Sequence, residues 1–284
     1  MTAGEVRELA RSFYRLGRLV LRLAAWPSAK RSTFTELAGI LADGVAGQVE
    51  EERAYQISER LVGAVYPHYL FSEYGRTWLD DEAFRRYYQR FMDPGNWHSI
   101  DRKFALCELL KLCRTVPGDT VECGAYKGAT SYLICREQAL NGAEKHRHHF
   151  VFDSFAGLSE PDGRDGSYWT AGDLQATEED VRAALAEFSA FTILPGWIPE
   201  RFAEVENQRF AFVHIDVDLY QPTRDSIEFF YPRLNPGGIL LLDDYGFRSC
   251  PGATAAADEF FADKDEAVAN LPTGQGVVVK AVGG

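Results

Sequence analysis

The sequence predicts an α/β protein in which a doubly wound, mostly parallel sheet follows a helical N-terminal region. From about residue 100 onward, short apolar runs alternate with segments whose apolar residues recur at helical spacing, a pattern typical of strands alternating with helices. Two of these runs, 210–215 and 239–242, stop abruptly at acidic residues, as buried parallel strands do where they leave the sheet. The segment 223–234 between them has helical spacing and precedes Asn235-Pro-Gly-Gly. This part of the chain is therefore predicted to be one strand–helix–strand unit, with the helix ending at that turn.

The other elements of the sheet-forming part follow the same alternation. Gly and Pro residues separate the segments, as expected where strands and helices end. We expect helices over 100–113, 129–140, 178–188 and 253–261, strands over 120–123, 148–152 and 191–194, and a terminal hairpin of 267–271 with 276–280.

Residues 1–95 are predicted to be helical, because they contain no convincing strand pattern. Their first helix has an apolar stripe beside a basic stripe formed by Arg7, Arg11, Arg15, Arg18 and Arg22. Such a stripe is usually a solvated face, but here it also suits contact with the acidic body of a second subunit or, as a weaker alternative, with an anionic surface. We expect two regions: 1–95, acting in oligomerisation or as a lid, and 96–284, which contains the sheet.

Composition limits the partners. The formal net charge is −12, which argues against a nucleic-acid backbone as partner, since phosphate binding needs a basic face. The five cysteines show no Cys-x-x-Cys spacing, so neither a disulfide framework nor a zinc site is indicated. No signal peptide is recognisable, and no apolar run approaches the roughly 18 residues of a membrane span. We expect a cytoplasmic protein without a membrane span.

Four aspartates follow the two strands of the strand–helix–strand unit. Asp216 and Asp218 come after the first strand, and Asp243 and Asp244 after the second. The carboxyl ends of adjacent parallel strands open on one edge of the sheet, with the strands about 4.8 Å apart. If the strand geometry continues, Asp216 and Asp218 point the same way. Four carboxylates so close repel one another unless a cation lies between them, and a hard divalent ion is the simplest candidate.

A glycine-rich turn follows the first predicted strand. Glu122, Gly124 and Gly128 occupy the place of a nucleotide-binding turn, but the dinucleotide pattern Gly-x-Gly-x-x-Gly is absent, which disfavours NAD and FAD. Such a turn suits a ligand with an amino-acid end and no pyrophosphate. Asp153 ends the second strand, where an acidic residue can accept hydrogen bonds from ribose hydroxyls. Each feature also has a structural alternative, as a tight connection or a cap.

With these residues in view, the chain resembles the macrocin-type O-methyltransferases, a family of S-adenosylmethionine-dependent Rossmann-like enzymes that methylate sugar hydroxyls of natural products. The resemblance covers about 117–282 and rests on five blocks in order: VECGAYKG (121–128), FDSFAGL (152–158), HIDVDLYQPT (214–223), NPGGILLLDDYG (235–246) and PTGQG (272–276).

The resemblance implies a site and two cofactors. It implies magnesium ligands at Asp216, Asp243 and Asp244, and it makes Asp218 the first candidate for the base and His214 the second. The candidate contacts of S-adenosylmethionine are Glu122, Gly124, Gly128, Ser131, Asp153, Ser154 and Trp197.

The predicted activity is therefore S-adenosylmethionine- and Mg²⁺-dependent O-methylation of a small, sugar-bearing molecule. Two other classes stay open. Asp216-Val-Asp218 is also the Asp-x-Asp of glycosyltransferases that bind nucleotide sugars, and the carboxylates could instead cap helices in a non-catalytic Rossmann-like module.

Overall fold

The structure is a computed structural model that describes residues 81–91 and 100–281, together with positions 27, 28, 31, 32, 35, 38, 39, 58, 59, 62 and 78. The 284-residue chain divides into two compact units, Met1–Thr77 and Trp78–Gly284. The predicted arginine stripe lies outside the described residues. The second unit contains the sheet and all of the candidate site residues.

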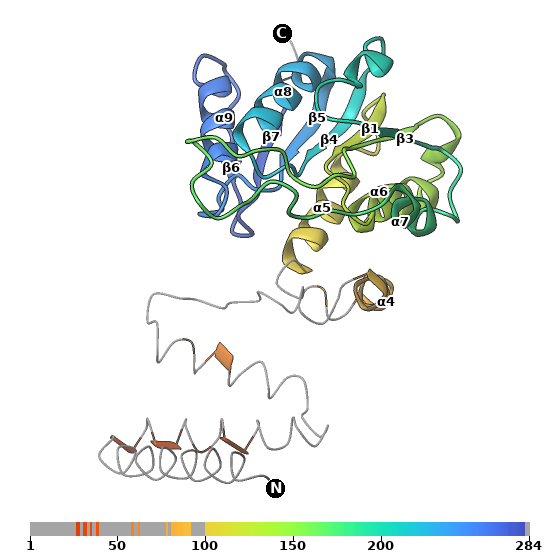
Figure 1. Cartoon of the computed structure of the whole chain (residues 1–284). Coiled ribbons are helices and arrows are strands. Elements are labelled where there is room, and N and C mark those ends of the chain that lie inside the picture. Colours follow the sequence, from red (N-terminus) through yellow and green to blue (C-terminus); the bar gives the residue numbers. More distant parts are fainter. Residues whose placement is uncertain are drawn as a thin grey trace, which may run out of the picture. The chain divides into compact units, whose positions relative to one another are not determined.

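Seven strands form one sheet in the order β3-β2-β1-β4-β5-β7-β6 (Figure 1). The five strands from β3 to β5 are mutually parallel, whereas β7 runs antiparallel to β5 and β6. This confirms the predicted doubly wound, mostly parallel sheet and its terminal hairpin. The strands are β1 (Asp119–Cys123), β2 (His149–Asp153), β3 (Phe191–Pro195), β4 (Phe210–Ile215), β5 (Leu234–Leu242), β6 (Ala269–Asn270) and β7 (Gly276–Val279).

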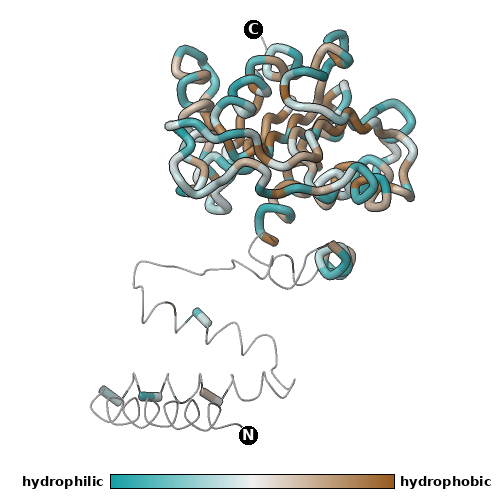
Figure 2. The backbone as a smooth tube through the Cα atoms, in the orientation of Figure 1, coloured by the Kyte–Doolittle hydropathy of each residue, from teal (hydrophilic) through white to brown (hydrophobic). Residues whose placement is uncertain are grey.

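Helices cover both faces of the sheet (Figure 1). Along β5, Leu240 and Leu242 pack toward α8 and α9, whereas Ile239 and Leu241 pack toward α4, α5 and α6. This alternation follows from the two-residue period of a strand, and it explains why the backbone is most hydrophobic along the central strands (Figure 2). The helices are α4 (Glu82–Phe91), α5 (Ile100–Leu112), α6 (Ala129–Leu140), α7 (Glu178–Ala184), α8 (Tyr220–Phe230) and α9 (Pro251–Phe261), with short 3-10 turns at Ala143–Lys145, Phe202–Val205 and Tyr231–Arg233.

The boundary between α8 and β5 differs from the prediction. The sequence pattern predicts a helix that continues to residue 234, but α8 ends at Phe230, and β5 already begins at Leu234. Leu234 pairs with Phe210 and Ile239 with Phe212, so the register shifts between these pairs. The Asn235-Pro-Gly-Gly segment is thus a bulge within the strand, because sheet pairing at Leu234 outweighs its helical spacing. Helix α7 likewise ends at Ala184 rather than at 188.

Helix α4 belongs to the sheet-containing unit, although the sequence pattern places it in the N-terminal region. Phe84 and Tyr87 are buried in the same cluster as Leu106 of α5 and Leu133 of α6. The Tyr87 hydroxyl donates to the carbonyl of Ala129 at 3.0 Å, at the start of α6. These aromatic residues therefore pack against the helices that carry the site.

Candidate active site

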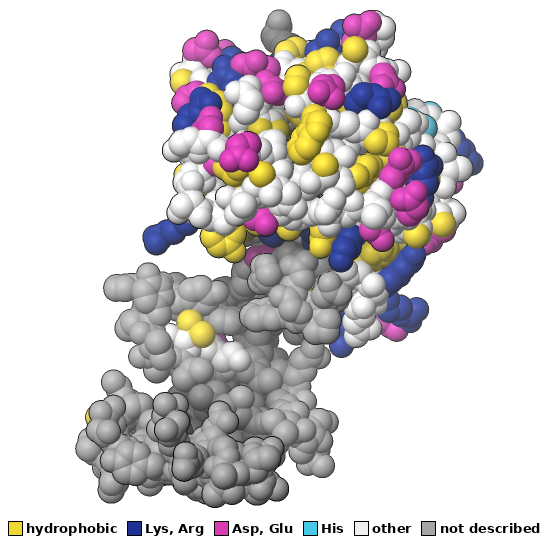
Figure 3. Space-filling view, viewed as in Figure 1, with side chains coloured by type: hydrophobic (Ala, Val, Ile, Leu, Met, Phe, Trp, Pro, Cys, Tyr) yellow, Lys and Arg dark blue, Asp and Glu magenta, His cyan; other side chains and the backbone are white. Residues whose placement is uncertain are grey.

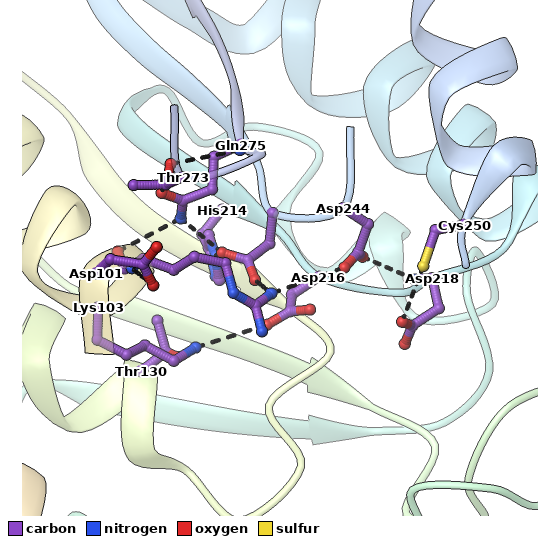
Figure 4. A network of polar contacts seen from close by, with 12 residues as sticks. Asp101, Lys103, Thr130, His214, Asp216, Asp218, Asp244, Cys250, Thr273 and Gln275 are labelled. Carbon is purple, nitrogen blue, oxygen red and sulfur yellow. Dashed lines mark hydrogen bonds and ion pairs between the residues drawn. The ribbon is translucent and has the colours of Figure 1, made fainter. Parts of the chain in front are cut away.

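The four aspartates gather at the carboxyl edge of β4 and β5, as two groups. Figure 4 shows Asp216, Asp218 and Asp244 among them. Ile215 and Leu242, the last residues of the strands, are register partners. In one group, ligand atoms of Asp216, Asp243 and His214 lie within 4.8 Å of one another. Asp218, Asp244 and Cys250 form the other group, within the same limit.

Asp218 is separated from Asp216 by a turn in the backbone. The strand ends at Ile215, and Asp218 has a φ of 59°, so the two carboxylates do not follow the strand geometry that would point them the same way. The Asp218 N–H donates to Oδ2 of Asp244 at 3.0 Å, and the Cys250 thiol lies 3.5 Å from Oδ1 of Asp218. These contacts fix Asp218 beside the end of β5.

Two basic residues in the first turn of α5 neutralise part of the cluster. Nη1 of Arg102 forms an ion pair with Oδ2 of Asp243 and lies 3.9 Å from Oδ1 of Asp244. Nζ of Lys103 donates to Oγ1 of Thr130 at 2.5 Å and lies 3.8 Å from Oδ2 of Asp216 (Figure 4). Neither residue was identified from the sequence. The sequence contained one indication of their role: two adjacent basic residues at the start of a helix, where the helix dipole disfavours positive charge.

The aspartates differ in how well their charge is compensated. Burial opposes ionisation of Asp243, but the nearby charges of Arg102 and Lys103 hold the pKa of its carboxyl well below its ordinary value. Burial and the charge of Asp216 raise the pKa of Asp218 to about 7. Burial and neighbouring carboxylates also raise the pKa values of Asp216 and Asp244. The ionised forms of these three aspartates are therefore disfavoured, and the described basic residues do not fully offset this.

His214 connects the cluster to the interior. Its ring is fully buried, with Nδ1 3.1 Å from Oε1 of Glu122 and Nε2 3.3 Å from Oδ1 of Asp243. Burial lowers the pKa of His214, but its hydrogen bonds to the two carboxylates outweigh this and raise the pKa to about 9. A protonated His214 would donate to both carboxylates. Gln275, from the PTGQG block, donates to the same Asp243 oxygen at 2.7 Å.

A buried polar chain continues from Glu122 across the sheet. The Ser131 hydroxyl donates to Glu122 and lies 3.0 Å from Nε2 of His149, whose Nδ1 lies 2.9 Å from the Thr120 hydroxyl. Glu122 and Ser131 have no exposed surface. Both predicted cofactor contacts therefore lie beneath the glycine turn, and His149 is a member that sequence reasoning missed.

The glycine turn touches the acidic cluster directly. Gly124 has a φ of 85°, and a Cβ there would lie 1.8 Å from the carbonyl oxygen of Asp216, so only glycine fits. Asp153 holds the turn from β2: Oδ2 accepts from the N–H groups of Ala125 (2.8 Å) and Tyr126 (2.9 Å). Oδ1 accepts the N–H of Phe155 at 2.7 Å.

The other predicted cofactor contacts surround this turn. Gly128, with a φ of 81°, starts α6 and packs against α7. Ser154 closes its own loop, donating to the carbonyl of Gly157 at 2.9 Å. Trp197, just after β3, is 40% exposed and open to a ligand.

Comparison with known proteins identifies the family. Residues 106–270, more than half of the chain, match the profile of the macrocin O-methyltransferases (TylF). The chain belongs to this family. The match includes β1 to β5 and both aspartate pairs, and it confirms the resemblance found in the sequence.

Curated relatives of the family share this part of the chain. A tetracenomycin 4'-O-methyltransferase of Streptomyces olivaceus, whose substrate carries a 2,3-dimethoxyrhamnosyl group, is 32% identical over 52% of this chain and 60% of its own length. Demethyldecarbamoylnovobiocin O-methyltransferase of Streptomyces niveus is also 32% identical, over 53% of this chain and 60% of its own length. The matched region thus spans about 60% of these relatives.

Solved structures agree on the fold. The O-methyltransferase NovP aligns with a TM-score of 0.54 and 26% identity, over 64% of this chain and 81% of its own. The calicheamicin methyltransferase CalS11 aligns with a TM-score of 0.57 and 18% identity, over 81% of this chain and 93% of its own, and shows the Rossmann-like fold alone.

The surface of the sheet-containing unit carries mixed charge. Acidic and basic side chains are interspersed on its visible face (Figure 3).

Within the part of the chain that the structure describes, no helix is both long and apolar enough to cross a membrane.

Proposed function

We propose that the protein is an S-adenosylmethionine-dependent O-methyltransferase that transfers a methyl group to a sugar hydroxyl of a natural product, with a divalent metal at the aspartate cluster. The observation that carries this proposal is the close contact between Gly124 in the predicted cofactor turn and the backbone of Asp216 in the acidic cluster. A methyl donor on the turn and a hydroxyl at the cluster would be neighbours, as a bimolecular transfer requires. The names of the curated relatives support the sugar-bearing acceptor.

The cofactor is proposed to lie over Gly124 and Asp153, with Ser154 and Trp197 at its sides. Oδ1 of Asp153 accepts one backbone N–H, and a carboxylate oxygen can accept more than one hydrogen bond. A ribose hydroxyl could therefore bind without dismantling the turn. Glu122, Ser131 and Gly128 would support this site from beneath.

The acidic cluster suits a divalent cation by its chemistry. Asp216, Asp243 and Asp244 offer the hard oxygen ligands that Mg²⁺ prefers. The raised pKa values of Asp216 and Asp244 indicate that their ionised forms lack enough compensating positive charge, which a bound cation would supply. These three side chains, of which Asp216 and Asp243 lie in one group and Asp244 in the other, are the proposed ligands. When bound, the ion would lower the pKa of an acceptor hydroxyl and supply positive charge beside it.

Asp218 is the proposed base. Its backbone N–H is held by Asp244 and its carboxylate contacts Cys250, so its position is defined. In the transfer, the acceptor oxygen forms a bond to the methyl carbon, the bond from that carbon to sulfur breaks, and Asp218 takes the hydroxyl proton. A base with a pKa near the working pH performs this role best. His214, with both ring nitrogens bound to carboxylates, would hold Asp243 in place instead.

Paired isosteric variants test these roles. Asp216→Asn removes a proposed ligand, so metal affinity should fall and excess Mg²⁺ should restore part of the rate. Asp218→Asn cannot accept the proton, so its rate at saturating Mg²⁺ should stay lower by roughly 10²- to 10⁴-fold. The rates are measured with S-adenosylmethionine and an accepted glycoside in excess. Asp263→Asn, whose side chain is 85% exposed, is the matched control.

Two results would contradict these assignments. Full turnover of Asp218→Asn at saturating Mg²⁺ would show that another residue is the base. Equal wild-type rates with and without excess EDTA would show that the metal is not required.

A further inference from the structure

Arg102 lies where a cation is expected at the acidic cluster. We propose that its guanidinium is the internal counter-ion of the cluster in the metal-free protein, and that Arg102 and a divalent metal compete for the same carboxylates. This inference rests on the metal site proposed above and adds a residue that controls its occupancy.

The competition follows from which oxygens Arg102 contacts. Its Nη1 pairs with Oδ2 of Asp243 and lies 3.9 Å from Oδ1 of Asp244. Both aspartates are proposed metal ligands. The Asp243 carboxylate is 1% exposed and the Arg102 side chain 17% exposed, so the pair is largely shielded from water. Shielding of this kind strengthens the repulsion between two cations that share the site.

Both oxygens of Asp243 already have partners in the structure. Its Oδ1 accepts from Nε2 of Gln275 at 2.7 Å and faces Nε2 of His214 at 3.3 Å. Oδ2 is the oxygen held by Arg102. Gln275 and His214 hold Oδ1 from the sheet side, so Oδ2 is the atom available for coordination. A metal that binds Oδ2 would share it with the guanidinium, and repulsion between the two cations makes their binding competitive.

The position of Arg102 is consistent with a counter-ion that can leave. Its Nε is buried and has no hydrogen-bond partner, and the guanidinium packs 4.9 Å from the ring centroid of Phe247. Arg102 also lies in the first turn of α5, where the helix dipole disfavours a cation. The charge of the aspartates, rather than a full set of hydrogen bonds, therefore holds it. Lys103 differs, because Thr130 accepts a hydrogen bond from it.

The test measures metal binding directly. Isothermal titration calorimetry with MgCl₂ is performed on the full chain after EDTA treatment and dialysis, for wild type, Arg102→Gln and Arg114→Gln. Arg102→Gln should bind Mg²⁺ roughly tenfold more tightly than wild type, because the competing charge is gone. Arg114 pairs with Glu137 and follows the end of α5 at Leu112, which is about 15 Å along the helix from Arg102. Its variant controls for the change in net charge and should match wild type.

Thermal unfolding gives a second readout and checks folding. Without metal, Arg102→Gln should melt below wild type, since Asp243 loses its ion pair, and saturating Mg²⁺ should raise its melting temperature more than that of wild type. Equal or weaker Mg²⁺ binding by a folded Arg102→Gln overturns the competition but leaves the metal site intact. Absence of Mg²⁺ binding in all three proteins overturns the metal site and the competition together.

Discussion

Individual side chains at the strand ends differ in charge according to the cation nearest to each. Asp243 has Arg102 on one oxygen and His214 and Gln275 on the other. Among the described residues, the carboxylate of Asp218 has the weak thiol contact from Cys250 as its one side-chain hydrogen bond. The same residue type therefore has its pKa lowered at Asp243 and raised at Asp218, as the proposed base requires.

Asp153 allows the most direct test of the proposed cofactor site. Asp153→Asn keeps the shape of the side chain but replaces one acceptor oxygen by a donor. Wild type should melt at a higher temperature with S-adenosylhomocysteine and not with UDP-sugars, because a ligand that binds the native state stabilises it. The variant should show a smaller shift, with Asp263→Asn as control.

Other outcomes of this thermal-shift experiment would favour the two alternative classes. A shift with a UDP-sugar and Mg²⁺ alone would favour a glycosyltransferase. An equal shift with S-adenosylhomocysteine in wild type and in Asp153→Asn would remove Asp153 from the binding site.

At the level of elements, the site is built where one edge of the sheet meets the first turn of α5. Adjacent β4 and β5 present the aspartates at the same edge, and the start of α5 presents Arg102 and Lys103 toward them. Beneath them, polar side chains on β1, β2 and β4 face the same helix layer. Glu122, His149 and His214 thus form a buried polar layer under α5 and α6.

His149 in this layer should make stability depend on pH. Burial lowers its pKa to about 4, against about 6.5 in an unfolded chain. Between these values the unfolded chain binds a proton that the native protein does not, so stability is present above pH 6.5 and falls as pH decreases toward 4. The loss amounts to roughly 3 kcal/mol at most.

Urea unfolding from pH 4 to 7 checks this contribution. His149→Gln should have lower stability at pH 7 but a shallower decline toward pH 4. His146→Gln, at an exposed position, should keep the slope of wild type. An unchanged slope in His149→Gln would mean that other groups cause the acid sensitivity.

At the scale of the whole molecule, the sequence places a basic stripe in residues 1–26 and leaves a strongly acidic remainder. We expect homo-oligomers in which this stripe contacts the body of another subunit. The Arg11→Glu/Arg15→Glu double variant should have a lower mass by light scattering than wild type. A double change at Arg182 and Arg209, both exposed in the sheet-containing unit, should not lower it. A monomeric wild type would refute the expectation.

Much of the fold could be predicted because its determinants are local. The sequence shows the apolar runs of β4 and β5 and the glycine turn after β1. The parallel arrangement of the strands follows from the alternation of strands with helices. The end of α8 was mispredicted, because pairing of Leu234 with Phe210 depends on a strand elsewhere in the chain. Helical spacing in 231–234 could not reveal that competition.

The sequence by itself determined that four aspartates and a glycine turn meet at one sheet edge, since strand direction fixes which ends coincide. Only the tertiary structure decided what surrounds each carboxylate. Arg102 and Lys103 precede β1 in the chain, and Gln275 follows β5, yet all three reach the aspartate cluster. The positions of these three side chains depend on how α5 packs on the sheet and how β7 pairs with β5. Such long-range packing produces no periodic pattern in the sequence.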